Sequence, residues 1–475
     1  TNGNENLAKI ALFTLPIIWL GPIADMITSL GRGHTITYIF DGPKALLMDF
    51  LTFFGPQVTL GLRIELFVIL FAIGWYVWSI RKNIKATFFA VLLSYAFLFF
   101  IFALPSIIYG FGHIDTLTNP ASAGNVARFL ETSISKSNIA YNTIDSTLLY
   151  GSSNRAFELG FDKLLSQISF ILAFIFISVW FWQTKKEKLV AVIKNSRPER
   201  VAFYLALLVL GIGYAGVIGY GKINSWMDWL GIATLIISWY GAWMFAVHTN
   251  DVADVSIDKI SNPNRPITKN AVEEAEMSGS GHIWLMVALL GSWSVGYYPF
   301  FMNLVFTAAY YIYSVPPLRL KRVPMLSSFL ISVACLSTVL AGFFFLSADK
   351  TFYAFSSFLA IGILIIFTLG TNVRDLKDVD GDRKEGIQTL PVIFAKNGKR
   401  MVAVFFALSF LLVPIFISFY TSYIVAIPIA ILGYRAVMRK SYDEKRIFYL
   451  YFAFIISCVA LVAIIYWLVN ILQIK

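Results

Sequence analysis

Two aspartate-rich segments, each placed directly after a long apolar run, carry the residues of this chain with the clearest chemistry. The first is NDVADVSID at residues 250–258, and the second is DLKDVDGD at residues 375–382. Carboxylates at a membrane surface repel one another and are costly to dehydrate, so two such groups favour a shared multivalent cation. Diphosphate is the ligand that such a cation would hold.

The spacing predicts that each set of carboxylates lies along one face of a helix. Asn250, Asp254 and Asp258 recur every fourth residue on a helix that continues from the preceding apolar run, with Asp251 beside them. The second set has helical spacing too, and consists of Asp375, Asp378 and Asp382. Because Mg²⁺ prefers one or two carboxylates together with phosphate oxygens and water, two facing helix ends would suit ions that bridge a diphosphate. Two solvated helix ends are the alternative.

Basic residues supply the complementary charges. In YSVPPLRLKR at residues 313–322, the two prolines end a helix and hold Arg319, Lys321 and Arg322 near the surface, where they are candidate phosphate ligands. A basic cluster after an apolar run is also an ordinary topology signal. Arg265, in NPNRP at residues 262–266, is a candidate phosphate clamp because a guanidinium offers a two-pronged donor; alternatively, it only ties down its loop.

Long apolar helices must position these groups. Hydrophobic residues make up 58% of the chain, charged residues only 14%, and the mean hydropathy is +0.72. We therefore predict an all-α polytopic membrane protein, which excludes the soluble helical prenyl synthases that also use paired Asp-rich motifs. The net charge of +11 does not indicate a nucleic-acid partner, because the basic residues cluster at the ends of apolar runs. Cys335 and Cys458 lie inside apolar segments and indicate neither a disulfide framework nor a metal site.

The chain is predicted to have two regions. Residues 185–475 hold nine candidate spans, near 201–221, 227–248, 282–298, 299–314, 325–347, 352–370, 401–419, 421–437 and 447–471. Residues 1–184 form an N-terminal membrane extension with about four more, near 9–29, 64–80, 86–110 and 165–183. The total is about thirteen. The first is interrupted by proline and glycine, so a re-entrant segment is the alternative.

Charge sets the expected orientation. Lysine and arginine precede the first of the nine spans and recur after the second, fourth, sixth and eighth. By the positive-inside rule, both Asp-rich segments then lie on the cytoplasmic face of the cell membrane. The same rule places a polar stretch at about residues 111–164 outside the cytoplasm.

Four motifs, in order, resemble the UbiA superfamily of intramembrane prenyltransferases over about residues 188–475. The family's NDxxDxxxD and NPxRP elements are matched by residues 250–266, and its DxxDxxxD and GxxTLP elements by DLKDVDGD and GIQTLP. Its YSxPPLRLK element is matched at residues 313–321, and its KxxRP element at residues 194–198. Residues 1–184 lie outside this resemblance.

The resemblance implies nine helices around a central cavity that binds a prenyl diphosphate through Mg²⁺. It places the metal ligands at Asn250, Asp254, Asp258, Asp375, Asp378 and Asp382. The implied diphosphate contacts are Asn250, Arg197, Arg265, Arg319 and Lys321. Arg319 and Lys321 would neutralise the departing diphosphate, and the ring of Tyr313 would stabilise an allylic cation. Asp251 is the candidate base on the acceptor side, with metal binding as its alternative role.

These expectations describe a Mg²⁺-dependent transfer of a polyprenyl group to a small acceptor in the bilayer, either an aromatic quinone precursor or a glycerol-phosphate lipid. Phosphoribosyl-type transfer to a polyprenyl phosphate and a noncatalytic isoprenoid-binding scaffold are the alternatives. An ion-coupled transporter would place its carboxylates near the membrane middle, whereas these lie at span ends. The residues do not distinguish the acceptors or the prenyl chain lengths.

Overall fold

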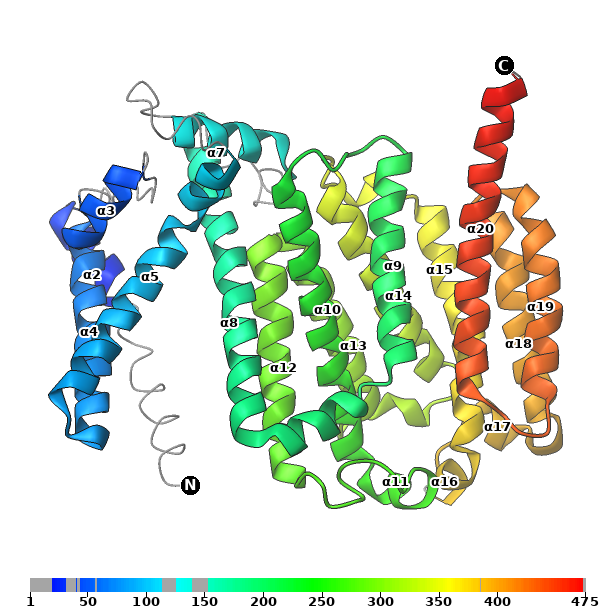
Figure 1. Cartoon of the computed structure of the whole chain (residues 1–475). Coiled ribbons are helices and arrows are strands. Elements are labelled where there is room, and N and C mark those ends of the chain that lie inside the picture. Colours follow the sequence, from blue (N-terminus) through cyan, green and yellow to red (C-terminus); the bar gives the residue numbers. More distant parts are fainter. Residues whose placement is uncertain are drawn as a thin grey trace. The chain divides into compact units, whose positions relative to one another are not determined.

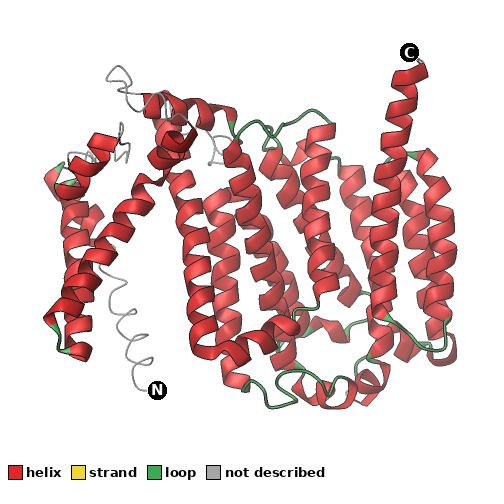
Figure 2. Ribbon diagram, in the orientation of Figure 1, coloured by secondary structure: helices red, strands yellow, loops and turns green. Residues whose placement is uncertain are grey.

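The computed structural model describes residues 19–30, 40, 43–55, 58–112, 125–138, 153–384 and 386–472. Every regular element in these residues is a helix (Figure 2). The chain divides into two compact units, one of residues 1–140 and 146–169 and the other of residues 141–145 and 170–475. This division falls inside one long helix, whereas the sequence places the junction of its two regions after residue 184. Each unit is described by itself.

The first unit contains two long apolar helices at the predicted positions. Its elements are α2 (Leu20–Thr28), α3 (Pro43–Leu51), α4 (Leu60–Arg81), α5 (Ile84–Gly112) and α7 (Asn125–Lys136). The predicted span at 9–29 begins outside the described residues, and its described part, α2, has nine residues, too few to cross a bilayer alone. Much of the predicted polar stretch at 111–164 also lies outside the described residues.

The second unit has a long helix at each of the nine predicted spans. Its long helices are α8 (Ser153–Lys194, which starts in the first unit), α9 (Pro198–Val217), α10 (Trp226–Ala253), α12 (Glu274–Val295), α13 (Tyr297–Ser314), α14 (Leu326–Leu346), α15 (Ser357–Gly370), α18 (Ala395–Phe416), α19 (Tyr423–Met438) and α20 (Glu444–Leu472). Its short helices are α11 (Val255–Ser261), α16 (Val379–Lys384) and α17 (Leu390–Ile393), with 3₁₀ segments η5 (Leu320–Arg322), η6 (Phe352–Ala354), η7 (Thr371–Lys377) and η8 (Tyr420–Ser422).

In the described residues, ten helices are long and apolar enough to cross a membrane. They make the chain an integral membrane protein. The predicted total of about thirteen is not confirmed, because α2 is too short and neither α12 nor α13 is among the ten. The first turn of α12 carries Glu274 and Glu276, which lowers its apolar character.

Close helix crossings build the core of the second unit. The helix α14 contacts α9, α13 and α15. At the crossing with α9, a Cβ on Gly211 would lie 2.0 Å from the carbonyl oxygen of Val339, and one on Gly342 would lie 2.0 Å from that of Leu208. Small residues let membrane helices approach this closely, so these two glycines fix the α9–α14 crossing.

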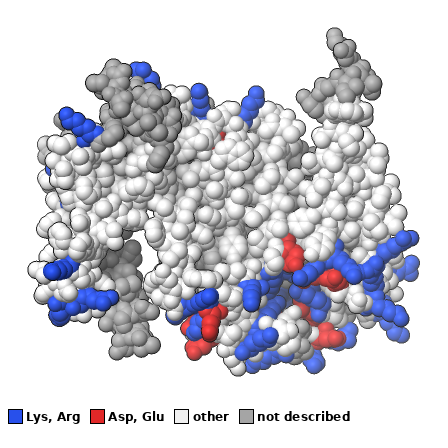
Figure 3. Space-filling model, viewed as in Figure 1, with Lys and Arg blue, Asp and Glu red and all other residues white. Residues whose placement is uncertain are grey.

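The charged residues of the second unit gather at one end. Its long helices run side by side, and α11, α16 and α17 lie together at the same end (Figure 1). In the face shown by Figure 3, Lys, Arg, Asp and Glu crowd this end while the surface of the long helices is almost uncharged. We call it the motif end, because both Asp-rich segments lie there.

Candidate active site

Both Asp-rich segments bend at their middle aspartate. Asp254 separates α10 from α11 with φ −113° and ψ 18°, and Asp378 separates η7 from α16 with φ −105° and ψ 6°. These values lie near the sparsely populated bridge region, where many active-site residues are found. The prediction of one continuous helix for each set is therefore wrong: the first set spans the end of the long helix α10 and the short helix α11, and the second spans η7 and α16.

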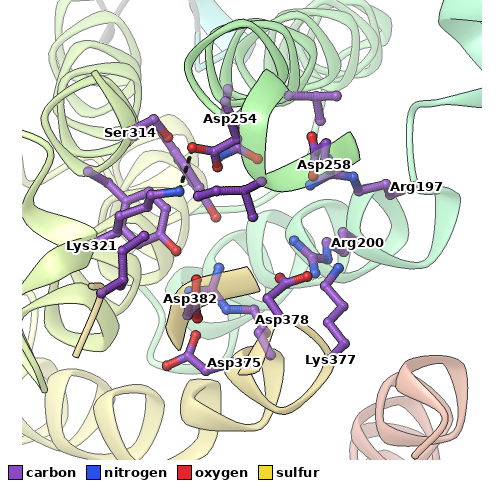
Figure 4. A pocket seen from close by; sticks show the side chains of 18 of the residues that line it. Arg197, Arg200, Asp254, Asp258, Ser314, Lys321, Asp375, Lys377, Asp378 and Asp382 are labelled. Carbon is purple, nitrogen blue, oxygen red and sulfur yellow. Dashed lines mark hydrogen bonds and ion pairs between the residues drawn. The ribbon is translucent and has the colours of Figure 1, made fainter. Parts of the chain in front are cut away.

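The two bent segments nevertheless place their side chains around one cavity at the motif end. The free volume of this cavity is about 70 Å³. Of the predicted site residues, its lining includes Arg197, Asn250, Asp254, Asp258, Arg265, Tyr313, Lys321, Asp375, Asp378 and Asp382. Figure 4 shows Asp254 and Asp258 on one side and the second set of aspartates on the other. Asp251 and Arg319 are not part of the lining but contact residues that are.

Asp251 is buried in a network of cationic and amide donors. Its Oδ1 accepts hydrogen bonds from Arg197 Nη2 at 2.8 Å and from Arg265 Nη1, and its Oδ2 accepts one from Asn195 Nδ2 at 2.6 Å. The side chain is 1% exposed. Both carboxylate oxygens are already occupied by these donors, so this geometry supports a positioning role for Asp251 rather than the predicted role as a base.

Asp254 is held by two of the three basic residues of the 313–322 segment, Arg319 and Lys321. Its Oδ1 lies 2.8 Å from Arg319 Nη2 and 2.5 Å from Lys321 Nζ (Figure 4). Arg319 has a left-handed backbone with φ 39°, and Arg197, which enters the site from another connection, has φ 54°. Such conformations are uncommon outside glycine and are often found at functional sites.

Asn262 links the two Asp-rich segments. Its Nδ2 donates to Asp258 Oδ1 at 3.0 Å and to Asp378 Oδ1 at 3.3 Å. Arg265, three residues further along the NPNRP element, pairs with Asp258 Oδ2 at 2.6 Å as well as with Asp251. The element that follows the first segment therefore joins α11 to α16, and Arg265 faces carboxylates rather than open space.

The carboxylates of the second Asp-rich segment have fewer ion-pair partners than those of the first. Among the described residues, no ion pair within 4.0 Å reaches Asp375, Asp378 or Asp382, although Arg374 and Lys377 lie close in sequence. Burial raises the pKa of Asp382 to about 7, and repulsion from Asp375 and Asp378 adds to the rise. Burial also raises the pKa of Asp258 to about 6, against the opposing effect of Arg265. The cavity therefore holds carboxylates that lack a full set of counter-charges.

Sequence reasoning missed several residues that also line the cavity. Arg374 and Lys377 lie within the second Asp-rich region and Arg200 lies one turn after Arg197, so their spacing was a usable signal. Glu444, at the start of α20, gave no such signal. It accepts hydrogen bonds from Arg200 Nε at 3.0 Å and from Lys377 Nζ at 3.1 Å, and so joins α20 to the site.

A small aromatic cavity of about 30 Å³ adjoins the polar one and shares Arg200, Tyr310 and Arg374 with it. Phe203, Phe448 and Tyr451 are among its other lining residues. Tyr313, which the sequence assigns to an allylic cation, lines the polar cavity, and Arg374 Cζ lies over its ring at 5.7 Å. One face of the Tyr313 ring is therefore already covered by a cation.

The donor set fits a hard divalent cation chemically. Carboxylates and an amide oxygen dominate it, and the hydroxyls of Ser314 and Thr389 at the lining have no hydrogen-bond partner among the described residues. In the described parts of the chain, no three acidic, histidine or cysteine side chains are close enough to hold a metal ion as they stand. Asp254 Oδ1 is instead bound by Arg319 and Lys321.

Comparison with known proteins agrees with the sequence motifs. A model of the UbiA prenyltransferase family matches residues 208–459. This match covers more than half of the chain and lies inside the stretch predicted from the motifs. A digeranylgeranylglyceryl phosphate synthase of Pyrococcus horikoshii is 28% identical over 33% of this chain and 54% of its own length. A chloroplastic chlorophyll synthase of Avena sativa is 31% identical over 33% of this chain and 42% of its own length. The chain thus spans about half the length of these relatives.

Among solved structures, a UbiA homologue from Archaeoglobus fulgidus bound to GPP and Mg²⁺ is similar with a TM-score of 0.46 and 15% identity. That likeness covers 56% of this chain and 96% of the homologue. The family match over more than half of the chain, together with the ordered motifs that meet at one cavity, confirms the predicted resemblance. The chain belongs to the UbiA prenyltransferase family.

Proposed function

We propose that this chain is a Mg²⁺-dependent intramembrane prenyltransferase, which moves a polyprenyl group from a prenyl diphosphate to a small acceptor. The observation that carries the proposal is the meeting of two Asp-rich segments, from α10–α11 and from η7–α16, at one cavity that arginine and lysine side chains also line. A diphosphate needs both kinds of group, metal ligands for its cations and basic side chains for its remaining oxygens.

Two sets of side chains would hold the metal. They are Asn250, Asp254 and Asp258 from the first segment and Asp375, Asp378 and Asp382 from the second. When bound, Mg²⁺ neutralises charge on the diphosphate oxygens. The raised pKa of Asp382, about 7, reflects burial and repulsion from Asp375 and Asp378, and among the described residues this carboxylate has no ion-pair partner, so a cation could bind it.

Arg319 and Lys321 would change partners when substrate binds. Both bind Asp254, and in the proposed mechanism these two cations would move from this carboxylate to the phosphate oxygens of the bound donor. The bond between the allylic carbon and the diphosphate oxygen then breaks, and its electron pair leaves with the diphosphate. Preorganised positive charge at the leaving group stabilises that transition state.

Aromatic side chains would stabilise the allylic cation beside the polar cavity. Tyr310 lines both cavities, and the face of Tyr313 becomes free once Arg374 turns from its ring to the diphosphate. The acceptor nucleophile attacks the cation and loses its proton. An aromatic quinone precursor and a glycerol-phosphate lipid are the acceptor classes we propose, and one relative is named for a glyceryl phosphate product.

We place the site on the cytoplasmic face of the cell membrane. The proposal rests on the positive-inside rule, because lysine and arginine recur at the motif end of the long helices. Prenyl diphosphates are charged at one end and apolar at the other, so a polar cavity at a helix end next to an aromatic one suits their two parts.

Diphosphate release tests the proposal directly. Full-length protein in detergent would be mixed with geranylgeranyl diphosphate, Mg²⁺ and a panel containing 4-hydroxybenzoate and a prenylated glycerol phosphate, followed by mass spectrometry of the lipid extract. We expect diphosphate release, and an adduct with one acceptor class, that both depend on Mg²⁺. Asp375→Asn should abolish both, whereas Asp380→Asn, on the exposed side of α16, should not.

The remaining outcomes separate the alternatives. Mg²⁺-dependent binding of the donor without release would contradict the proposal and favour an isoprenoid-binding scaffold. Transfer of the sugar from a phosphoribosyl diphosphate to a polyprenyl phosphate would instead show that the donor and the acceptor differ from those proposed.

A further inference from the structure

A long apolar groove lies between α8 and α12, away from the polar cavity. Its volume is about 690 Å³, and no residue that lines it lines the candidate active site. On α12 it extends from Glu276 to Leu290, which corresponds to about 21 Å at 1.5 Å per residue. Its walls include Phe174, Ile177 and Ile283. The groove is therefore long and apolar enough to hold a hydrocarbon chain rather than water.

The two ends of the groove differ in polarity. At one end the ring of Phe170 packs against α12, where a Cβ on Gly291 would lie 2.6 Å from it. At the other end, which is the motif end, the lining residues Lys185, Lys188 and Glu276 meet. Lys188 Nζ lies 2.5 Å from Glu276 Oε1, and Lys185 Nζ lies 3.9 Å from the same oxygen. Among the residues that line the groove, two lysines and one glutamate give this end one net positive charge.

The helix α8 changes direction at this charged end. Lys185 has non-helical dihedral angles, φ −140° and ψ 44°, and the chain beyond it runs across the motif end toward Asn195 (Figure 1). Val192, on this stretch, packs against Met244 and Met277. The segment ends at residues that bind Asp251, so the groove's charged end and the candidate active site are joined by about ten residues of one chain segment.

We propose that this groove is a binding site for an anionic phospholipid of the surrounding bilayer. One acyl chain lies along the apolar walls between α8 and α12, and the phosphate binds Lys185 and Lys188. Both lysine side chains remain accessible, at 49% and 42% exposure, and a lysine ammonium has three donors, so each can contact a phosphate while near Glu276.

The apolar lining of the groove favours a lipid over a free phosphate ion as its occupant. Ile283, Met286 and Leu290 are large apolar side chains of the groove that remain exposed, at 43%, 64% and 61%, which in a membrane means contact with hydrocarbon. The net positive end selects an anionic head group over a zwitterionic one, because basic side chains near the surface attract anionic lipids. A bound lipid would also hold in place the segment that leads to Asn195.

Retention of added lipid by the full-length protein tests this site without requiring turnover. Protein purified in detergent would be incubated with dioleoyl phosphatidylglycerol or dioleoyl phosphatidylcholine and examined by native mass spectrometry, with thermal denaturation in parallel. We expect phosphatidylglycerol to be retained preferentially and to raise the melting temperature. Gly279→Leu should remove most of that retention, because position 279 lines the groove and has open space for a side chain.

Gly213→Leu is the matched control. Gly213 also has open space around its Cβ position but lies on α9, outside the groove. Replacing both Lys185 and Lys188 with Gln should lower phosphatidylglycerol retention by about fivefold for each lysine and leave phosphatidylcholine retention unchanged. Equal loss of retention in Gly279→Leu and Gly213→Leu, or no loss in either, would overturn the groove assignment. Equal retention of the two lipids by the unmodified protein would overturn the head-group assignment.

Discussion

The two Asp-rich segments resemble each other in sequence and in their bend, but they differ in how their charges are balanced. In the first segment, Asp251, Asp254 and Asp258 each contact at least one arginine or lysine within 4.0 Å. In the second, none of the described ion pairs reaches an aspartate, and Asp378 receives only the amide of Asn262. Among the described residues, the first segment is tied to the protein's own cations, whereas the aspartates of the second segment have no ion-pair partner.

This difference indicates that two similar sequence motifs can have different roles. A buried carboxylate that already binds guanidinium groups stabilises the fold and positions those groups, whereas a buried carboxylate without a partner lowers stability until a ligand arrives. On this view Asp251 holds Arg197 and Arg265 in place, and Asp382 serves the substrate's metal. Substitutions inside and outside the two segments, and changes of pH and Mg²⁺, can test this comparison.

The largest expected effect concerns the second segment. Asp382→Asn should lower prenyl transfer by about 1000-fold, because it removes a charged ligand from the leaving-group site. Its melting temperature without Mg²⁺ should stay the same or rise, because repulsion with Asp375 and Asp378 is relieved. Steady-state rates and thermal denaturation measure the two effects. A marked loss of stability would show that Asp382 has a structural partner and would remove the contrast between the segments.

The first segment should respond in stability as well as in activity. Asp251→Asn leaves the Arg197 guanidinium without its carboxylate, while Arg265 keeps its pair with Asp258, and the change should cost about 3–5 kcal/mol in unfolding free energy. Chemical denaturation in detergent would measure it. The double variant with Arg197→Gln should recover part of the loss, since it removes the charge that Asp251→Asn leaves uncompensated. An Asp251→Asn protein as stable as the original would contradict the positioning role.

The pH dependence should follow the carboxylates with raised pKa values. Asp382 and Asp258 have pKa values of about 7 and about 6, above the ordinary 3.8, so the folded protein binds more protons than the unfolded chain between these limits. Without Mg²⁺, stability should therefore fall as pH rises from 4 to 7, because the two groups lose their protons while buried.

Mg²⁺ should reverse that trend, because it binds only the ionised groups. We expect its apparent affinity to rise about tenfold between pH 6 and pH 8. Calorimetric titration of Mg²⁺ in the presence of a non-hydrolysable donor analogue measures the affinity. An affinity independent of pH over this range would mean that neither carboxylate binds the metal.

The smallest effect is expected at Glu444, which lies outside both segments. Glu444→Gln weakens the orientation of Arg200 and Lys377, and we expect KM for the prenyl diphosphate to rise about tenfold with little change in kcat. Asp443→Asn is the control, because its carboxylate pairs with the exposed Arg446. Equal effects of the two changes would exclude a specific role for Glu444.

Much of the fold and of the site was predictable. Periodic apolar runs located each long helix of the second unit, and the repeated aspartates identified the side chains that line the cavity. The bend at Asp254 was not predictable, because the helical spacing of the aspartates continues through it in the sequence. Glu444 was also missed, because it meets Arg200 from a helix that lies far away in the sequence.

The sequence by itself determined the membrane setting, the places of the long helices, the family and the kinds of group at the site. These follow from local composition and from short motifs, whose meaning does not depend on distant residues. Only the tertiary structure decided which carboxylates are neutralised and which stay open, that Glu444 supports the site, and that a groove separates α8 from α12. Charge balance and cavities arise between helices, and so depend on distances that no single segment encodes.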